Sequence, residues 1–142
     1  MKENLKAKKR SKVLLLFVIF VSLLDLFLQL YFSAVGFGVA NRGVSFGLAQ
    51  TLNWDIKYLL LVLMTGLFCF LFLSKRGLNL GLFTLFVGGV VNLLVRFYLG
   101  FVWDYLRLPW VVIWINLSDV LITIGALSYI LVDDENRDSG GV

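Results

Sequence analysis

The feature that most restricts this sequence is an apolar run from Val13 to Phe32 that contains a single charged side chain, Asp25. About 20 apolar residues are enough for a helix to cross the hydrocarbon core of a bilayer. A cleaved signal peptide also begins with basic residues and an apolar run, but its run is shorter. We therefore expect a retained membrane-spanning helix over residues 13–32.

Three further apolar stretches follow, at residues 56–73, 80–99 and 110–132. The whole chain is 60% hydrophobic, which exceeds the proportion found in ordinary soluble domains. These features predict an all-α integral membrane protein with four transmembrane helices, forming a single membrane domain over residues 1–142. The segment between the first two helices is expected to be small and extracytoplasmic, and it can include β-strand.

The basic residues predict the orientation of these helices. Six of them crowd the first dozen positions, and Lys75 and Arg76 form a short turn between the second and third spans. Four spans place both groups on one side of the membrane, and the excess of Lys and Arg identifies that side as cytoplasmic. Both termini are then cytoplasmic. A basic run directly before an apolar span indicates contact with membrane lipids rather than nucleic acid.

The residue types that the chain lacks exclude several kinds of chemistry. It contains no histidine, which excludes Ser-His and Cys-His catalysis and histidine-based metal sites. Cys69 is the only cysteine, so no disulfide can form within the chain. Acid–base chemistry must therefore come from the remaining titratable groups, and carboxylates inside the membrane become the natural candidates.

Ionisable side chains inside membrane spans are energetically costly and usually functional. Away from the span ends, where Lys57 lies, they are Asp25, Arg96 and Asp119, and Asp104 follows the third span closely. The third and fourth spans are joined by a short loop, so they are expected to pack as antiparallel neighbours. Asp104 and Asp119 can then approach each other near the outer membrane face.

Two amides share helix faces with these charged groups. Asn92 lies four residues before Arg96, and Asn116 lies three residues before Asp119, so each pair projects from one side of its helix. We expect Asn92, Arg96 and Asn116 to support the two carboxylates. A close carboxylate pair shares one proton, which permits the acid–base chemistry of aspartic proteases without histidine or metal.

The residues alone leave other interpretations open. An Asp–Arg pair within a membrane can join two helices without doing chemistry. A small transporter or proton channel could use Asp25, Arg96 and Asp119, but conduction would need polar residues that reach both membrane faces. A non-catalytic membrane scaffold is the third alternative, and it predicts that substituting Asp104 and Asp119 leaves function unchanged.

Several motifs occur along nearly the whole chain in a fixed order. They are Asp25, then Asn41-Arg42-Gly43-Val44-Ser45-Phe46, then Gly88-Gly89, Asn92 and Arg96, then Gly100-Phe101-Val102-Trp103-Asp104, and finally Asn116-Leu117-Ser118-Asp119. In this order and spacing the sequence resembles the lipoprotein signal peptidase (signal peptidase II) family. The resemblance implies that Asp104 and Asp119 are the catalytic pair.

The same resemblance assigns roles to the neighbouring residues. It implies that Asn92, Arg96 and Asn116 hold the pair and contact substrate. It also implies that Asn41 and Gly43 frame the site, whereas Asp25 contributes mainly to stability. Four residues depart from the family pattern and make this a divergent member. Gln29 stands where a Lys is common, Val91 where a Gly is usual, Val95 where an Asp is usual, and Ser118 where an Ala is typical.

The resemblance further implies an intramembrane aspartyl endopeptidase of the bacterial cytoplasmic (inner) membrane, with its active site near the extracytoplasmic face. Its substrates would be prolipoproteins that carry a diacylglyceryl group on a cysteine, and cleavage would occur on the N-terminal side of that cysteine. No cofactor and no metal are implied. A monomer would be sufficient for this activity.

Overall fold

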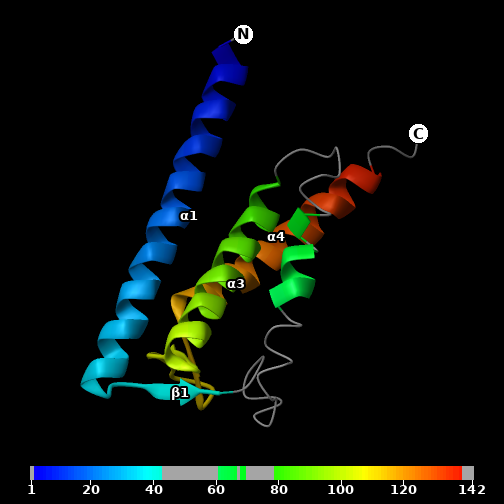
Figure 1. Cartoon of the computed structure of the whole chain (residues 1–142). Coiled ribbons are helices and arrows are strands. Elements are labelled where there is room, and N and C mark those ends of the chain that lie inside the picture. The colour runs from blue at the N-terminus through cyan, green and yellow to red at the C-terminus, as the bar shows by residue number, and fades with distance from the viewer. Residues whose placement is uncertain (1, 43–60, 67, 70–78, 139–142) are drawn as a thin grey trace.

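The computed structural model of the chain describes residues 2–42, 61–66, 68–69 and 79–138, and three long helices dominate it (Figure 1). Residues 61–66 and 68–69 are also helical. The other elements, in chain order, are α1 (Lys2–Val35), β1 (Val39–Asn41), α3 (Leu80–Leu99), β2 (Val102–Asp104), β3 (Leu106–Leu108), β4 (Ile113–Ile115) and α4 (Leu117–Asp138).

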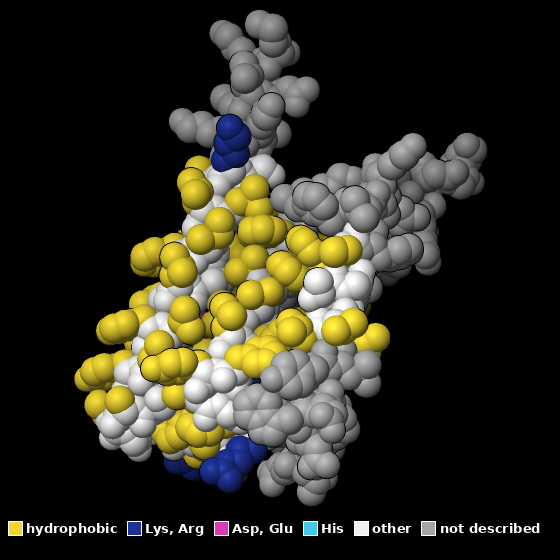
Figure 2. Space-filling view, in the orientation of Figure 1, with side chains coloured by type: hydrophobic (Ala, Val, Ile, Leu, Met, Phe, Trp, Pro, Cys, Tyr) yellow, Lys and Arg dark blue, Asp and Glu magenta, His cyan; other side chains and the backbone are white. Residues whose placement is uncertain are grey.

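Two of the described helices, Arg10–Val35 with mean hydropathy 2.7 and Leu80–Leu99 with mean hydropathy 1.9, are long and apolar enough to cross a membrane. Leu117–Leu131 is a shorter apolar helix. Hydrophobic side chains cover much of the visible face between the two ends of the molecule, where the Lys and Arg side chains lie (Figure 2). Most of the expected second span, residues 56–73, lies outside the described residues, so the presence of four spans stays a prediction.

The first turn of α1 and the last turn of α4 lie at one end of the molecule, and the strands lie at the other end (Figure 1). α3 packs against both α1 and α4. β1 follows the end of α1, β2 follows the end of α3, and β4 precedes the start of α4, so these three helix ends lie beside the strands. This end of the molecule contains the polar residues singled out in the sequence.

Local signals set the bounds of α3, which coincide with the expected third span. The Asn79 side chain caps the start of the helix by accepting a hydrogen bond from the Gly81 amide at 2.8 Å. The helix ends at Gly100, whose φ of 82° is left-handed and whose N–H donates to the Arg96 carbonyl at 2.9 Å. The chain therefore turns directly from α3 into β2, which ends at Asp104.

The strands form two antiparallel pairs. β1 pairs with β2, with Val39 opposite Asp104, and β3 pairs with β4, with Leu106 opposite Ile115. β1 lies in the segment between the first two expected spans, where a strand was anticipated. The expected fourth span began at residue 110, whereas residues 113–115 form β4 and the helix begins at Leu117. Apolarity alone cannot separate a short buried strand from a helix, and the Val-Val-Ile-Trp-Ile run suits a strand.

Glycine residues allow α3 and α4 to approach closely. A Cβ atom added to Gly81 would lie 2.8 Å from the Tyr129 backbone nitrogen and 2.9 Å from the Gly125 carbonyl oxygen. One added to Gly88 would lie 2.8 Å from the Ser118 carbonyl oxygen. Small residues at such positions let helix backbones pack closely in membranes, where no hydrophobic effect drives helices together.

We predict that Gly81→Val destabilises the protein, because its side chain would overlap the backbone of α4. Overpacking of this kind typically lowers the free energy of unfolding by about 1–3 kcal/mol. Thermal denaturation of the purified protein in detergent measures the effect. Leu94→Val, at an exposed position of the same helix, serves as the control. An equal change in melting temperature for both variants would contradict the close α3–α4 contact.

Candidate active site

Asp104 is held in place by two amides. It ends β2, and its residue is only 2% exposed. Asn41 donates from Nδ2 to one carboxyl oxygen at 2.9 Å, and Asn116 donates from Nδ2 to the other at 2.8 Å. Asn41 lies on β1, which pairs with β2, and Asn116 directly precedes α4. The Asp104 carboxyl group therefore lies between β1 and the start of α4.

Asp119 projects from the first turn of α4. One of its carboxyl oxygens accepts from Asn92 Nδ2 at 2.8 Å, and the other accepts from the Asn116 backbone N–H at 3.3 Å. The Asp119 N–H in turn donates to Asn116 Oδ1 at 2.9 Å, so Asn116 caps the helix. The Asn116 side chain thus contacts Asp104 through its nitrogen and the Asp119 backbone through its oxygen, which joins the two aspartates through one residue.

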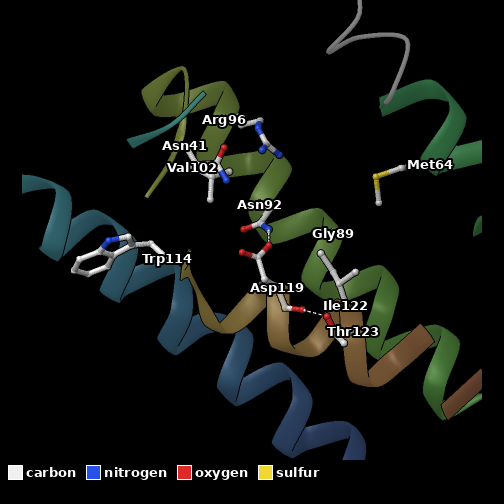
Figure 3. A pocket seen from close by; sticks show the side chains of 10 residues that line it. All are labelled: Asn41, Met64, Gly89, Asn92, Arg96, Val102, Trp114, Asp119, Ile122 and Thr123. Atoms are coloured by element: carbon white, nitrogen blue, oxygen red, sulfur yellow. Dashed lines mark hydrogen bonds between the residues drawn. The ribbon is translucent and has the colours of Figure 1, made fainter. Parts of the chain in front are cut away.

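A cavity of about 270 Å³ lies beside Asp119. Figure 3 shows the Asn92 and Asp119 side chains of its lining pointing toward each other and joined by their hydrogen bond, with Arg96 on the same helix as Asn92. Arg96 interacts electrostatically with both Asp119 and Asp104. The remaining lining residues are mostly apolar and are Met64, Gly89, Val102, Trp114 and Ile122, together with Asn41 and Thr123.

Asp25 lies next to this site and fixes the start of α4 from α1. Its residue is 0% exposed. Its two carboxyl oxygens accept from the backbone N–H groups of Leu117 at 3.0 Å and Ser118 at 3.1 Å. They also accept from the Tyr105 hydroxyl at 2.6 Å and from the Ser118 hydroxyl. A carboxylate at a helix N-terminus satisfies otherwise unpaired N–H groups and interacts favourably with the helix dipole.

Gln29 connects Asp25 with the site. Its Nε2 donates to Asp25 at 2.8 Å and to Asn92 Oδ1 at 3.2 Å. Its Oε1 accepts from the Trp103 backbone N–H at 3.2 Å. A single buried amide of α1 thus contacts α3, β2 and a second residue of its own helix.

Burial and hydrogen bonding change the pKa values of Asp104 and Tyr105. Burial raises the pKa of Asp104 to about 6, although the hydrogen bonds from Asn41 and Asn116 act in the opposite direction. Burial, followed by the hydrogen bond to Asp25, raises the pKa of Tyr105 well above its ordinary value. Tyr105 therefore stays protonated and remains a donor to Asp25, whereas Asp104 can hold a proton in mildly acidic solution.

The structure brings together six of the eight residues singled out in the sequence, namely Asn41, Asn92, Arg96, Asp104, Asn116 and Asp119. Asp25 lies next to this group and contacts the start of α4. Gly43 lies outside the described residues. Within the described part of the chain, no group of three or more His, Cys, Asp and Glu side chains could hold a metal ion.

Sequence reasoning missed the roles of Gln29, Tyr105 and Ser118 as partners of Asp25. One signal for Gln29 was available, because it follows Asp25 by four residues and so shares its helix face. No comparable signal identifies Tyr105 or Ser118. Their contacts with Asp25 join residues separated by 80 and 93 positions.

Comparison with known proteins identifies the family of this chain. A family profile described as Signal peptidase (SPase) II matches residues 6–133. A lipoprotein signal peptidase of Clostridioides difficile (strain 630) is 33% identical over 95 residues, which are 63% of this chain and 62% of that protein. One of Helicobacter pylori (strain Shi470) is 36% identical over 94 residues, which are 61% of this chain and 59% of that protein.

These matches cover only part of each relative. The chain spans about three fifths of the length of these curated relatives. No solved structure matches it significantly. The protein is mostly helical, and two of its described helices are long and apolar enough to cross a membrane. Asp104 and Asp119, joined through Asn116, form a polar site at one end of these helices. The chain belongs to the signal peptidase II family, and the resemblance seen in its motifs is thereby confirmed.

We predict that the Asp104 carboxyl group titrates near pH 6 and that Asn41→Ala moves its midpoint upward. The Asn41 amide stabilises the charged carboxylate, so its loss favours the protonated form and raises the pKa. Carboxyl carbon NMR of the labelled protein in detergent measures both midpoints. A midpoint near the ordinary value of 3.8, or a downward shift in Asn41→Ala, would contradict this description.

Proposed function

We propose that this protein is an intramembrane aspartyl endopeptidase that removes signal peptides from diacylglyceryl-modified prolipoproteins, cutting before the lipidated cysteine. The observation that carries the proposal is the joining of Asp104 and Asp119 through Asn116 beside the cavity. Membership of the signal peptidase II family supports the substrate class. Asp104 and Asp119 are the proposed catalytic pair, supported by Asn92, Arg96 and Asn116 and framed by Asn41 and Gly43.

The chemistry requires one proton shared by the two carboxyl groups. One carboxylate accepts a proton from a water molecule as that water attacks the scissile carbonyl carbon. The other carboxylic acid donates its proton when the carbon–nitrogen bond breaks, and the leaving nitrogen becomes an amine. The raised pKa of Asp104 supports this division, because a carboxyl group must hold a proton to act as the acid.

The size of the cavity supports a binding mode in which the peptide of the substrate enters the protein and its lipid chains stay outside. Ligand cavities for drug-sized molecules hold roughly 300–1,000 Å³, and a cavity of about 270 Å³ suits a few peptide atoms around the scissile bond. The exposed apolar side chains of α1 and α3 would face lipid. The diacylglyceryl chains of the substrate would therefore stay in the bilayer while the peptide reaches the aspartates.

The arrangement of the ends supports the proposed topology. The first turn of α1 and the last turn of α4 lie at the same end of the molecule, opposite the strands and the site. With the basic N-terminal residues in the cytoplasm, the site lies near the extracytoplasmic face of the bacterial cytoplasmic membrane. We propose four membrane-spanning helices, both termini in the cytoplasm, and a monomer that acts without a cofactor.

We predict that Asp104→Asn and Asp119→Asn each lower the rate of cleavage by about 10²–10⁴-fold, the usual contribution of general acid–base catalysis. Purified protein in detergent would be mixed with a diacylglyceryl-modified prolipoprotein, and cleavage would be followed by gel shift. Arg107→Gln is the control, because it neutralises an exposed charge on the neighbouring strand β3. It should leave cleavage unchanged.

The outcomes separate the proposal from its alternatives. Cleavage that survives either aspartate substitution would show that the catalytic pair is assigned wrongly. Failure of the folded, unsubstituted protein to cleave several such substrates would favour a scaffold. Proton flux into proteoliposomes, lost in Asp119→Asn, would instead favour a channel.

A further inference from the structure

Gln29 is a buried residue with three polar partners in three different segments. Its residue is 0% exposed. It donates to Asp25 of α1 at 2.8 Å and to Asn92 of α3 at 3.2 Å, and it accepts from the backbone of Trp103 in β2 at 3.2 Å. These bonds use both the nitrogen and the oxygen of its amide. The position therefore needs a donor and an acceptor on one side chain.

The partners of Gln29 lead directly to both aspartates. Asn92 is the residue whose Nδ2 donates to Asp119 at 2.8 Å. Because Gln29 donates to the oxygen of the same Asn92 amide, it determines that the nitrogen faces Asp119. A rotated Asn92 amide would point its oxygen at the carboxylate, which is unfavourable.

The second contact acts on the other aspartate. Trp103 directly precedes Asp104 in β2, and its N–H is bound by Gln29 Oε1. The Trp103 indole N–H also donates to the Phe37 carbonyl at 2.7 Å. Gln29 therefore holds the backbone of β2 from the side of α1, one residue before the carboxyl group that the strand positions.

We propose that Gln29 is a positioning residue that orients Asp104 and Asp119 relative to each other, acting through the Trp103 backbone and the Asn92 amide. The inference rests on the proposed peptidase function for its catalytic consequence. Gln29 touches neither aspartate of the pair, so its effect is one of geometry. A displacement of about 1 Å in a catalytic group can slow a reaction by about 100-fold.

Three substitutions divide the contacts of Gln29. Gln29→Lys keeps a donor for Asp25 and Asn92 but cannot accept from Trp103. Gln29→Glu in its ionised form keeps the acceptor and loses the donor. Gln29→Met has similar length and removes both. Ser22→Ala is the matched control, because Ser22 is a buried polar residue about two turns earlier in α1 whose hydroxyl donates to the Val18 carbonyl.

The first measurement is the kinetics of prolipoprotein cleavage by each variant, together with its melting temperature. We expect Gln29→Met to lower kcat by about 10- to 100-fold with little change in KM, since orientation matters most in the transition state. Gln29→Lys should lose less, because it still orients Asn92. Ser22→Ala should keep its kcat even where its melting temperature falls as far. Equal kcat losses in Ser22→Ala and Gln29→Met would overturn the proposal.

The second measurement is hydrogen–deuterium exchange of the segment that contains the Trp103 amide, which does not depend on activity. Exchange should be faster in Gln29→Met and Gln29→Lys, which lack the acceptor, than in the unsubstituted protein and Ser22→Ala. Unchanged exchange in both variants would overturn the proposed hold on β2. If the unsubstituted protein cleaves nothing, the peptidase function fails, and the exchange pattern alone decides whether Gln29 positions this strand.

Discussion

The site depends on the carboxylate of Asp25, which accepts five hydrogen bonds from described residues. Two of these come from the first N–H groups of α4, which would otherwise be buried without partners. The helix that carries Asp119 therefore receives part of its cap from α1. Tyr105, directly after Asp104, donates to the same carboxylate. One side chain of α1 thus fixes the segments that carry both proposed catalytic residues.

Two of the residues that the motif resemblance marks as departures from the family, Gln29 and Ser118, are partners of Asp25. Gln29 and Val95 stand where a Lys and an Asp are usual, and both are 0% exposed. Gln29, a neutral amide, donates a hydrogen bond to Asp25 without adding a charge to this buried region. The hydroxyl of Ser118, where Ala is typical, adds a neutral donor to Asp25.

The sequence predicted some of these features because they depend on local spacing. The bounds of α3 follow from its apolar run, Asn79 and Gly100, and the approach of Asp104 and Asp119 follows from the short connection between their segments. β4 was missed because Val111 to Ile115 is as apolar as a membrane helix. β3 was missed with it, because its three residues form a strand only by pairing with β4. The network around Asp25 was missed because its partners are distant in sequence, and only tertiary packing brings them together.

The glycines of α3 divide its surface into one stiff side and one yielding side. Toward α4, Gly81 and Gly88 face backbone atoms, which cannot move aside without moving the whole helix. Toward the helical residues 61–66, Gly89 instead faces the terminal methyl group of Met64, which also lines the cavity. A methionine side chain changes shape easily. Added bulk on the Gly89 side of α3 would therefore be accommodated by a change of the Met64 side chain, whereas added bulk at Gly81 or Gly88 would have to displace the α4 backbone.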